Sequence, residues 1–222
     1  MYSLLLTLHI AAGTTVLLAA AAALVTSKGA QRHIYAGRTF VLGMLGVFLT
    51  AVPMTFIRPN LFLFLIAVFS FYLASTGWLR ATNRTGIPTF ADWIAASVMT
   101  WTALAMCVVG IAGLRRGNAM GIVLVAFGAI GGIFALTDLY FLREKHYRGN
   151  FRIAAHLTRM LAGTIGAVTA FTVVNVRFEP EVIKWLAPTV VTMPLIVFWN
   201  IRVLRTTGFP VAKNDRGASD AA

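Results

Sequence analysis

The sequence has little of what a soluble enzyme contains. Only 12% of its 222 residues are charged and only seven are acidic, whereas about a quarter of the residues in an average soluble domain are charged. Cysteine occurs once, as Cys107, which excludes a disulfide framework and a thiolate metal cluster. The hydrophobic fraction is 59% and the mean hydropathy is +0.80. These values exclude a soluble globular protein and indicate one that resides in a membrane.

Seven long apolar runs dominate the sequence. Each is close to the ~20 residues that a helix rising ~1.5 Å per residue needs to cross a hydrocarbon core of ~30 Å. The longest intervals between them have twelve residues, which leaves no room for a soluble catalytic domain. The sequence therefore predicts an all-α integral membrane protein, a bundle of seven transmembrane helices that forms a single domain over residues 1–205, followed by a flexible cytoplasmic tail at 206–222. The runs cover residues 3–26, 39–57, 61–80, 93–114, 119–142, 153–176 and 183–205.

The basic residues indicate how these helices are oriented. If the N-terminus lies outside, thirteen Lys and Arg residues fall on the cytoplasmic side, five fall on the outer side, and Arg159 falls within a span. Because cytoplasmic loops are enriched in Lys and Arg, we expect the N-terminus outside and the C-terminus in the cytoplasm. The same residues explain the net charge of +12 without nucleic acid as a partner. At the inner face of the membrane they would attract anionic lipids.

Four ionisable residues lie within the expected spans, where a charged or unpaired polar group is costly. His9 lies in the outer half of the first span. Asp138 lies near the cytoplasmic end of the fifth, and His156 and Arg159 lie in the first two turns of the sixth, where a spacing of three places them on one helix face. The topology therefore brings Asp138, His156 and Arg159 to one depth. One interpretation is that Asp138 and Arg159 only neutralise each other as a structural ion pair.

A metal site is the second interpretation of this region. Two further histidines, His33 and His146, lie in loops expected on the cytoplasmic side, and His33 can reach the depth of Asp138 and His156. Two imidazoles and a carboxylate form a ligand set that suits zinc or iron with an open coordination position. The predicted metal ligands are therefore His33, Asp138 and His156.

Anionic substrates and haem are the other ligands to consider. Arg159, and with it Arg38, are candidate partners for an anionic substrate group, because a guanidinium binds carboxylates and phosphates with paired hydrogen bonds. Haem with two axial histidines needs both imidazoles at one depth. His9 and His156 lie at opposite depths, which disfavours that pairing.

Four stretches of the sequence match a known pattern. LHIAAG at 8–13 and SKGAQRHIYAGRTF at 27–40 resemble the start, and AHLTRMLAGTIGAVTAFTVVN at 155–175 and LAPTVVTMPLIVFW at 186–199 resemble the end, of the bacterial predicted membrane proteins grouped as domain-of-unknown-function family 2306. The resemblance implies a polytopic bacterial membrane protein and names no reaction. The positions of this sequence that match the family pattern are His9, Lys28, Gly29, His33, Gly37, Arg38, His156, Arg159 and Asn175.

Three functions remain open at this point. The first is a metal- or haem-dependent membrane enzyme or redox carrier that uses His33, Asp138 and His156. The second is a non-enzymatic carrier or sensor, in which His9, Asp138 and His156 relay protons or bind a small solute. Against a carrier of the inverted-repeat type, the sequence has no visible internal repeat and an odd number of spans. The third is a membrane scaffold whose polar residues only hold the helices together.

Overall fold

The computed structural model describes residues 1–144 and 147–205, and these residues form seven α-helices and no strand. Each helix is long and apolar enough to cross a membrane, which confirms the predicted all-helical fold. With 22 to 27 residues each, the helices extend for about 33–40 Å. The predicted tail at 206–222 and His146 lie outside the described residues. The helices are α1 (Tyr2–Val25), α2 (Gln31–Ile57), α3 (Leu61–Thr82), α4 (Phe90–Arg115), α5 (Gly121–Glu144), α6 (Gly149–Asn175) and α7 (Glu181–Arg205).

The second helix differs most from its predicted span. It begins at Gln31, eight residues before the apolar run, so that His33 lies in its first turns and not in a loop as predicted. The apolar run marks only the part of a helix that lies in hydrocarbon, whereas polar residues such as Gln31 and Arg32 continue the helix into the interface. The turn before it contains Gly29 with φ of +81°, a conformation that glycine adopts without a steric penalty.

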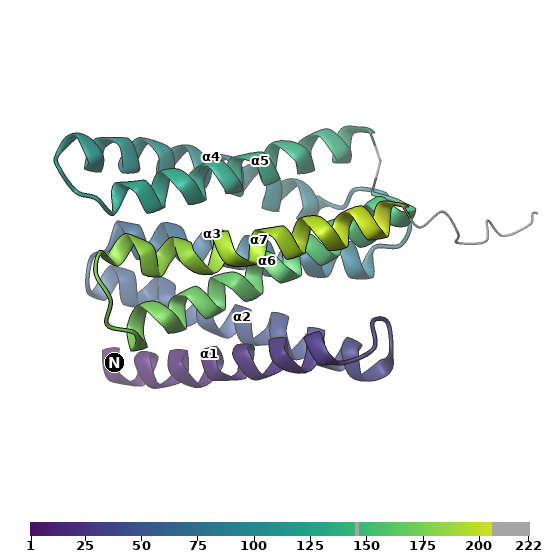
Figure 1. The fold of residues 1–222 in the computed structure, drawn as a ribbon, viewed down its shortest axis with the longest axis horizontal. Coiled ribbons are helices and arrows are strands. Elements are labelled where there is room, and N and C mark those ends of the chain that lie inside the picture. The colour runs from purple at the N-terminus through teal and green to yellow at the C-terminus, as the bar shows by residue number, and fades with distance from the viewer. Residues whose placement is uncertain (145–146, 206–222) are drawn as a thin grey trace, which may run out of the picture.

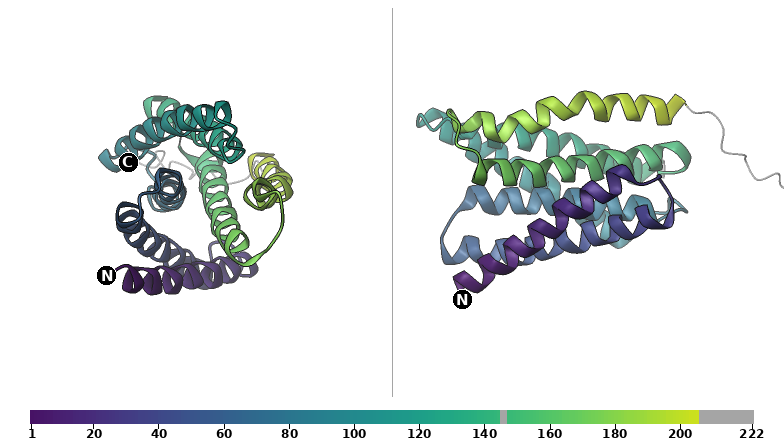
Figure 2. Two further views of the ribbon diagram at one scale, coloured as in Figure 1. Left: turned by 90° about the vertical axis from the view of Figure 1, so that its left-hand side faces the viewer. Right: turned by 60° about the horizontal axis from the view of Figure 1, so that its bottom comes forward.

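The helices alternate in direction and form two outer pairs around a central group (Figure 1). We call the end where α1 begins the amino end of the bundle, and the end where α7 terminates the carboxy end. The α1–α2 pair and the α4–α5 pair pack closely, and α3 contacts α2, α4 and α6. Viewed along the bundle, α6 lies between the two pairs (Figure 2). Within the described residues α6 packs against α3, α7 and α1, and its backbone does not approach that of α5, its predecessor in the chain.

Glycines bring the α4–α5 pair together. A Cβ atom on Gly121 would lie 2.4 Å from the carbonyl oxygen of Gly110, and one on Gly128 would lie 3.1 Å from the carbonyl oxygen of Ala103. Larger side chains would therefore push the two backbones apart. In a membrane, where helices associate through close contact more than through exclusion of water, such small residues stabilise the pair. The α4–α5 pair therefore packs closely on itself. Because the backbones of α5 and α6 do not approach each other in the part of the chain that the structure describes, side chains must connect this pair to α6.

Candidate functional site: a buried ion pair and an adjoining cavity

Asp138 and Arg159 form that connection between α5 and α6. The Nη2 atom of Arg159 lies 2.8 Å from Oδ1 of Asp138, and their side chains are only 5% and 2% exposed. The same Nη2 atom lies 3.3 Å from the carbonyl oxygen of Phe134, and the guanidinium carbon lies 4.0 Å from the centroid of the Phe134 ring. The predicted structural ion pair is thus present, and the face of an aromatic ring adds a further favourable contact for the cation.

Two tyrosines also donate hydrogen bonds to the Asp138 carboxylate. The hydroxyl of Tyr72 on α3 donates to Oδ2 of Asp138, and the hydroxyl of Tyr147 donates to Oδ1. Burial, together with the negative charge of Asp138, raises the pKa of Tyr147, so its hydroxyl remains protonated and continues to act as a donor. Both oxygens of Asp138 therefore accept hydrogen bonds, and a buried carboxylate needs such donors to remain ionised.

A second buried ion pair joins α3 to α4. Arg80 pairs with Asp92, and the guanidinium carbon of Arg80 lies 4.0 Å from the centroid of the Tyr147 ring. Asp92 also accepts from the backbone N–H and the hydroxyl of Thr89, forming the capping box with which α4 begins. Tyr147 therefore touches both ion pairs. We call this set the ion-pair cluster: Tyr72, Arg80, Asp92, Asp138, Tyr147 and Arg159.

The loop that carries Tyr147 is held by a close backbone approach. A Cβ atom on Gly86, which has φ of +71°, would lie 2.8 Å from the carbonyl oxygen of Tyr147. Arg152 adds a second link, because its Nη1 atom donates to the carbonyl oxygens of Arg80 and Ala81 at the end of α3, at 2.8 and 3.2 Å. Basic side chains are favourable at these unpaired terminal carbonyls. The carboxy end of the bundle is therefore tightly connected.

The three predicted metal ligands are not brought together as a metal site. Nδ1 of His156 lies 2.9 Å from the carbonyl oxygen of Gly77, and Nδ1 of His33 lies 3.1 Å from that of Ala23. Both oxygens of Asp138 are engaged by Tyr72, Tyr147 and Arg159. In residues 1–144 and 147–205, no group of three or more His, Cys, Asp or Glu side chains is arranged to hold a metal ion. The other predicted charge partner, Arg38, is exposed on α2.

The sequence did not point to four members of the ion-pair cluster: Tyr72, Arg80, Asp92 and Tyr147. The signal that could have found Asp92 is the scarcity of acidic residues, since Asp92 and Asp138 are two of only seven in the chain. Each lies in a helix long and apolar enough to cross a membrane, where an acidic side chain requires a basic partner. The tyrosines carry no such signal, because an aromatic residue in a span usually packs or faces lipid.

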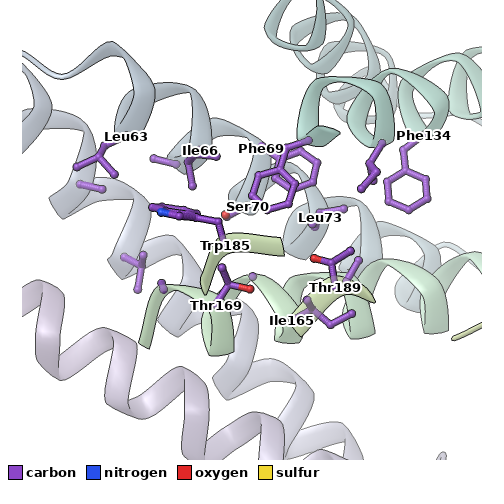
Figure 3. Close-up of a pocket in the computed structure, with 18 of the residues that line it drawn as sticks. Leu63, Ile66, Phe69, Ser70, Leu73, Phe134, Ile165, Thr169, Trp185 and Thr189 are labelled. Atoms are coloured by element: carbon purple, nitrogen blue, oxygen red, sulfur yellow. The ribbon is translucent and has the colours of Figure 1, made fainter. Parts of the chain in front are cut away.

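A large cavity adjoins the ion-pair cluster at Phe134. It has a volume of about 710 Å³ and lies among α1, α2, α3, α5, α6 and α7. Most of its lining is apolar, and on α7 the lining continues from Trp185 to Leu204, which corresponds to about 28 Å of helix. Its volume falls within the ~300–1,000 Å³ of typical ligand pockets. Figure 3 shows part of it between α3, α6 and α7, with Phe69 and Trp185 on its wall.

His9 lines this cavity and not the ion-pair cluster. Its Nδ1 atom lies 3.0 Å from Oγ1 of Thr50, and that hydroxyl lies 2.8 Å from the carbonyl oxygen of Gly46. A hydroxyl has one hydrogen, which Thr50 donates to the backbone, so Nδ1 of His9 must be the donor to Thr50. In the neutral imidazole this assigns the other nitrogen, Nε2, as a hydrogen-bond acceptor.

Three hydroxyls face the cavity without a hydrogen bond. Ser70, Thr169 and Thr189 all line it, and Figure 3 shows their oxygens pointing into the space bounded by α3, α6 and α7. Thr169 is 2% exposed, and its Oγ1 atom has no partner within the described part of the chain. We call these three groups the cavity hydroxyls. They could donate to or accept from a molecule bound beside them.

Comparison with known proteins adds no assignment. No protein-family model, no curated protein and no solved structure matches the chain. The function must therefore be argued from the arrangement of its own residues.

Proposed function

We propose that this chain is a bacterial inner-membrane protein that binds a small, largely apolar molecule in its interhelical cavity, as a carrier or a sensor. The observation that carries the proposal is the cavity itself, which is large, mostly apolar and lined by residues of six helices. Ligand sites combine such walls with a few polar groups that fix the orientation of the ligand. The cavity hydroxyls and His9 are polar groups of this kind.

The ion-pair cluster has a different role in this proposal. Its two carboxylates and two arginines are paired, and its tyrosines are engaged as donors and as a ring surface. Such a cluster connects α3, α4, α5 and α6 beside the cavity. A metal-dependent reaction here has less support. Nδ1 of His33 and Nδ1 of His156 each contact a backbone carbonyl, and Asp138 already accepts a hydrogen bond from Arg159.

Orientation and family belong to the same proposal. The distribution of thirteen basic residues on one side against five on the other supports an outer N-terminus and a cytoplasmic C-terminus. In that orientation the ion-pair cluster lies in the cytoplasmic half of the membrane and His9 in the outer half. The four stretches described above support membership of domain-of-unknown-function family 2306.

Filling the cavity tests the proposed function. Ala162 lines the cavity on α6, whereas Ala21 is exposed on α1 and does not line it. We expect the native protein, purified from membranes in mild detergent, to retain an apolar molecule that organic solvent extracts and mass spectrometry detects in near-stoichiometric amount. Ala162→Phe should lose this molecule and Ala21→Phe should keep it. The proposal fails if native protein and both variants carry the same background of bulk lipid.

A further inference from the structure

The cavity hydroxyls depart from the behaviour of other hydroxyls in these helices. Thr76 and Thr164, for example, donate to the carbonyl oxygens of Tyr72 and Met160, four residues earlier, at 2.7 and 2.9 Å. This local bond is the usual way to satisfy a hydroxyl in a membrane helix. Among the described residues, Ser70, Thr169 and Thr189 make no such bond. Because Thr169 is buried, its unpaired hydroxyl is unfavourable unless a bound molecule supplies the partner.

The depth of these hydroxyls limits the chemistry of that molecule. Ser70 lies nine residues after the start of α3, Thr189 eight after the start of α7, and Thr169 six before the end of α6. They are therefore about 9–14 Å, along the helices, from the amino end of the bundle. The headgroup region is only about 5–8 Å thick on each side. Charged lipid headgroups, and the ester carbonyls beside them, belong to that region, so a molecule that binds to the cavity hydroxyls must present a neutral group within the hydrocarbon layer.

The walls next to the hydroxyls favour a flat group. The rings of Phe69 and Phe127 stack with centroids 5.6 Å apart, and both line the cavity together with Trp185. Trp185 and Ser70 both line the part of the cavity drawn in Figure 3. Aromatic side chains provide flat faces on which a planar conjugated ring packs well. Of the described residues that line the cavity, only Arg58 carries a fixed charge, and it lies at the amino end.

The rest of the cavity suits a long apolar chain. From Thr189 to Leu204 the lining on α7 covers about 22 Å of helix. Asn200, a polar residue of this stretch, is hydrogen-bonded within the protein, because its Nδ2 atom lies 2.7 Å from Oγ1 of Thr158 on α6 and 2.9 Å from the carbonyl oxygen of Ile196. Both hydrogens of its amide nitrogen are therefore engaged, and the other residues that line this stretch after Thr189 have apolar side chains.

We propose that the cavity binds a long-chain quinone, with a carbonyl oxygen accepting from the cavity hydroxyls and the chain lying along α7. This inference rests on the proposed function and names the class of its ligand. A quinone is neutral and planar, and its carbonyl oxygens are acceptors that match hydroxyl donors. A quinone has two carbonyl oxygens, whereas a simple ketone has one. The additional acceptor suits this cavity, because three hydroxyls are available as donors, those of Ser70, Thr169 and Thr189.

Matched ligands test this assignment on the purified full-length protein. Decylbenzoquinone and decylbenzene share ring and chain, and only the first has carbonyl groups; methyl laurate supplies an ester carbonyl on a similar chain. We expect decylbenzoquinone to bind most tightly in equilibrium binding with labelled ligands. Thr169→Val should weaken its binding about 3- to 10-fold, the value of one hydrogen bond. Ser70→Ala should weaken it in the same direction, and neither change should affect decylbenzene.

Thr164→Val is the matched control, because this hydroxyl lies on the same helix and is satisfied by Met160. It should leave the binding of all three ligands unchanged. Equal affinities for decylbenzoquinone and decylbenzene, unchanged in Thr169→Val, would overturn the quinone assignment while leaving the apolar-ligand function intact. Tighter binding of methyl laurate than of decylbenzoquinone would replace the quinone with an acyl ester. If none of the ligands binds, the proposed function fails together with the inference.

Discussion

The ion-pair cluster and the cavity meet at Phe134, whose ring lies under the guanidinium of Arg159 and also lines the cavity, yet their polar groups are satisfied in opposite ways. In the cluster, both oxygens of Asp138 accept hydrogen bonds from other helices or loops. Of the buried side-chain nitrogen and oxygen atoms of the cluster, only the Nε atoms of its two arginines lack a partner within the described part of the chain. In the cavity, the hydroxyl of Thr169 is equally buried and has no partner among residues 1–144 and 147–205.

This difference separates a structural role from a binding role. Charge in a membrane is tolerated when each ion is paired and hydrogen-bonded, and in the ion-pair cluster both carboxylates are paired with an arginine. Neutral hydroxyls that remain unpaired cost less, and they retain a directional bond for a visiting molecule. The most conspicuous residues of the sequence, its intramembrane charges, therefore account for assembly, whereas unremarkable Ser and Thr residues form the candidate site.

Removing one ion from the cluster should have the largest effect. Arg159→Leu leaves Asp138 buried without its counter-ion, and we expect it to lower the free energy of unfolding by about 3–5 kcal/mol. The measurement is reversible unfolding of the purified protein in mixed micelles. The matched control is Glu181→Gln at the pair of Glu181 with Lys184, where the Glu181 side chain is 56% exposed. This change should cost less than about 1 kcal/mol.

A double variant shows whether the loss comes from the unpaired charge. Asp138→Leu combined with Arg159→Leu removes both ions, and we expect it to be more stable than Arg159→Leu alone. If the two single effects simply add, Asp138 and Arg159 do not stabilise each other, and the structural role assigned to the pair is wrong.

Tyr147→Phe should have a smaller effect on the same cluster. It removes the hydroxyl that donates to Asp138 but keeps the ring that contacts Arg80. A hydrogen bond to a charged group contributes about 1.5–3 kcal/mol, which is the expected loss in unfolding free energy. Tyr35→Phe, at an exposed tyrosine of α2, is the control and should change stability by less than about 0.5 kcal/mol.

The pH dependence of stability provides an independent check on Tyr147. Its pKa in the folded protein is raised by burial, so the unfolded chain loses this proton first as the pH rises. The stability that Tyr147 contributes is therefore fully present below about pH 10, the ordinary tyrosine pKa, and is lost above it. Tyr147→Phe should show a shallower alkaline loss of stability than the native protein. An identical alkaline profile would mean that the hydroxyl is not buried as described.

Substituting Val for Thr should have the smallest effects, and they should differ in sign between the two regions. Thr169→Val removes an unpaired buried hydroxyl, so we expect the ligand-free protein to become more stable by about 1 kcal/mol. Thr76→Val removes a hydroxyl that donates to Tyr72 beside the ion-pair cluster and should cost about 1 kcal/mol. Unfolding of delipidated protein measures both. A loss of stability in Thr169→Val would show that its hydroxyl is satisfied in the native protein.

Much of the fold could be predicted from the sequence, because the length of an apolar run is dictated by the thickness of the membrane. The pairing of Asp138 with Arg159 could also be predicted, since a buried charge requires a partner at the same depth. The hydrogen bonds from Tyr72 and Tyr147 to Asp138 could not be predicted, because they depend on how α3 and the residues before α6 are positioned relative to α5. The error at His33 has a similar origin: hydropathy does not detect the polar first turns of α2.

The cavity was the least predictable feature. It exists because α6 packs on α3 and α7 and not on α5, which leaves space between neighbours in the chain. No local pattern encodes such a space, and Ser70, Thr169 and Thr189 become distinctive only when their missing hydrogen bonds are seen.

The shift in unfolding midpoint caused by decylbenzoquinone tests most directly whether binding belongs to the cavity and stability to the ion-pair cluster. A ligand that binds the folded state raises the midpoint, and the rise depends on affinity. We expect Tyr147→Phe to unfold at a lower temperature than the native protein but to show the same rise with ligand. Ala162→Phe, which fills the cavity, should show almost no rise. The account is contradicted if Tyr147→Phe abolishes the rise while Ala162→Phe retains it.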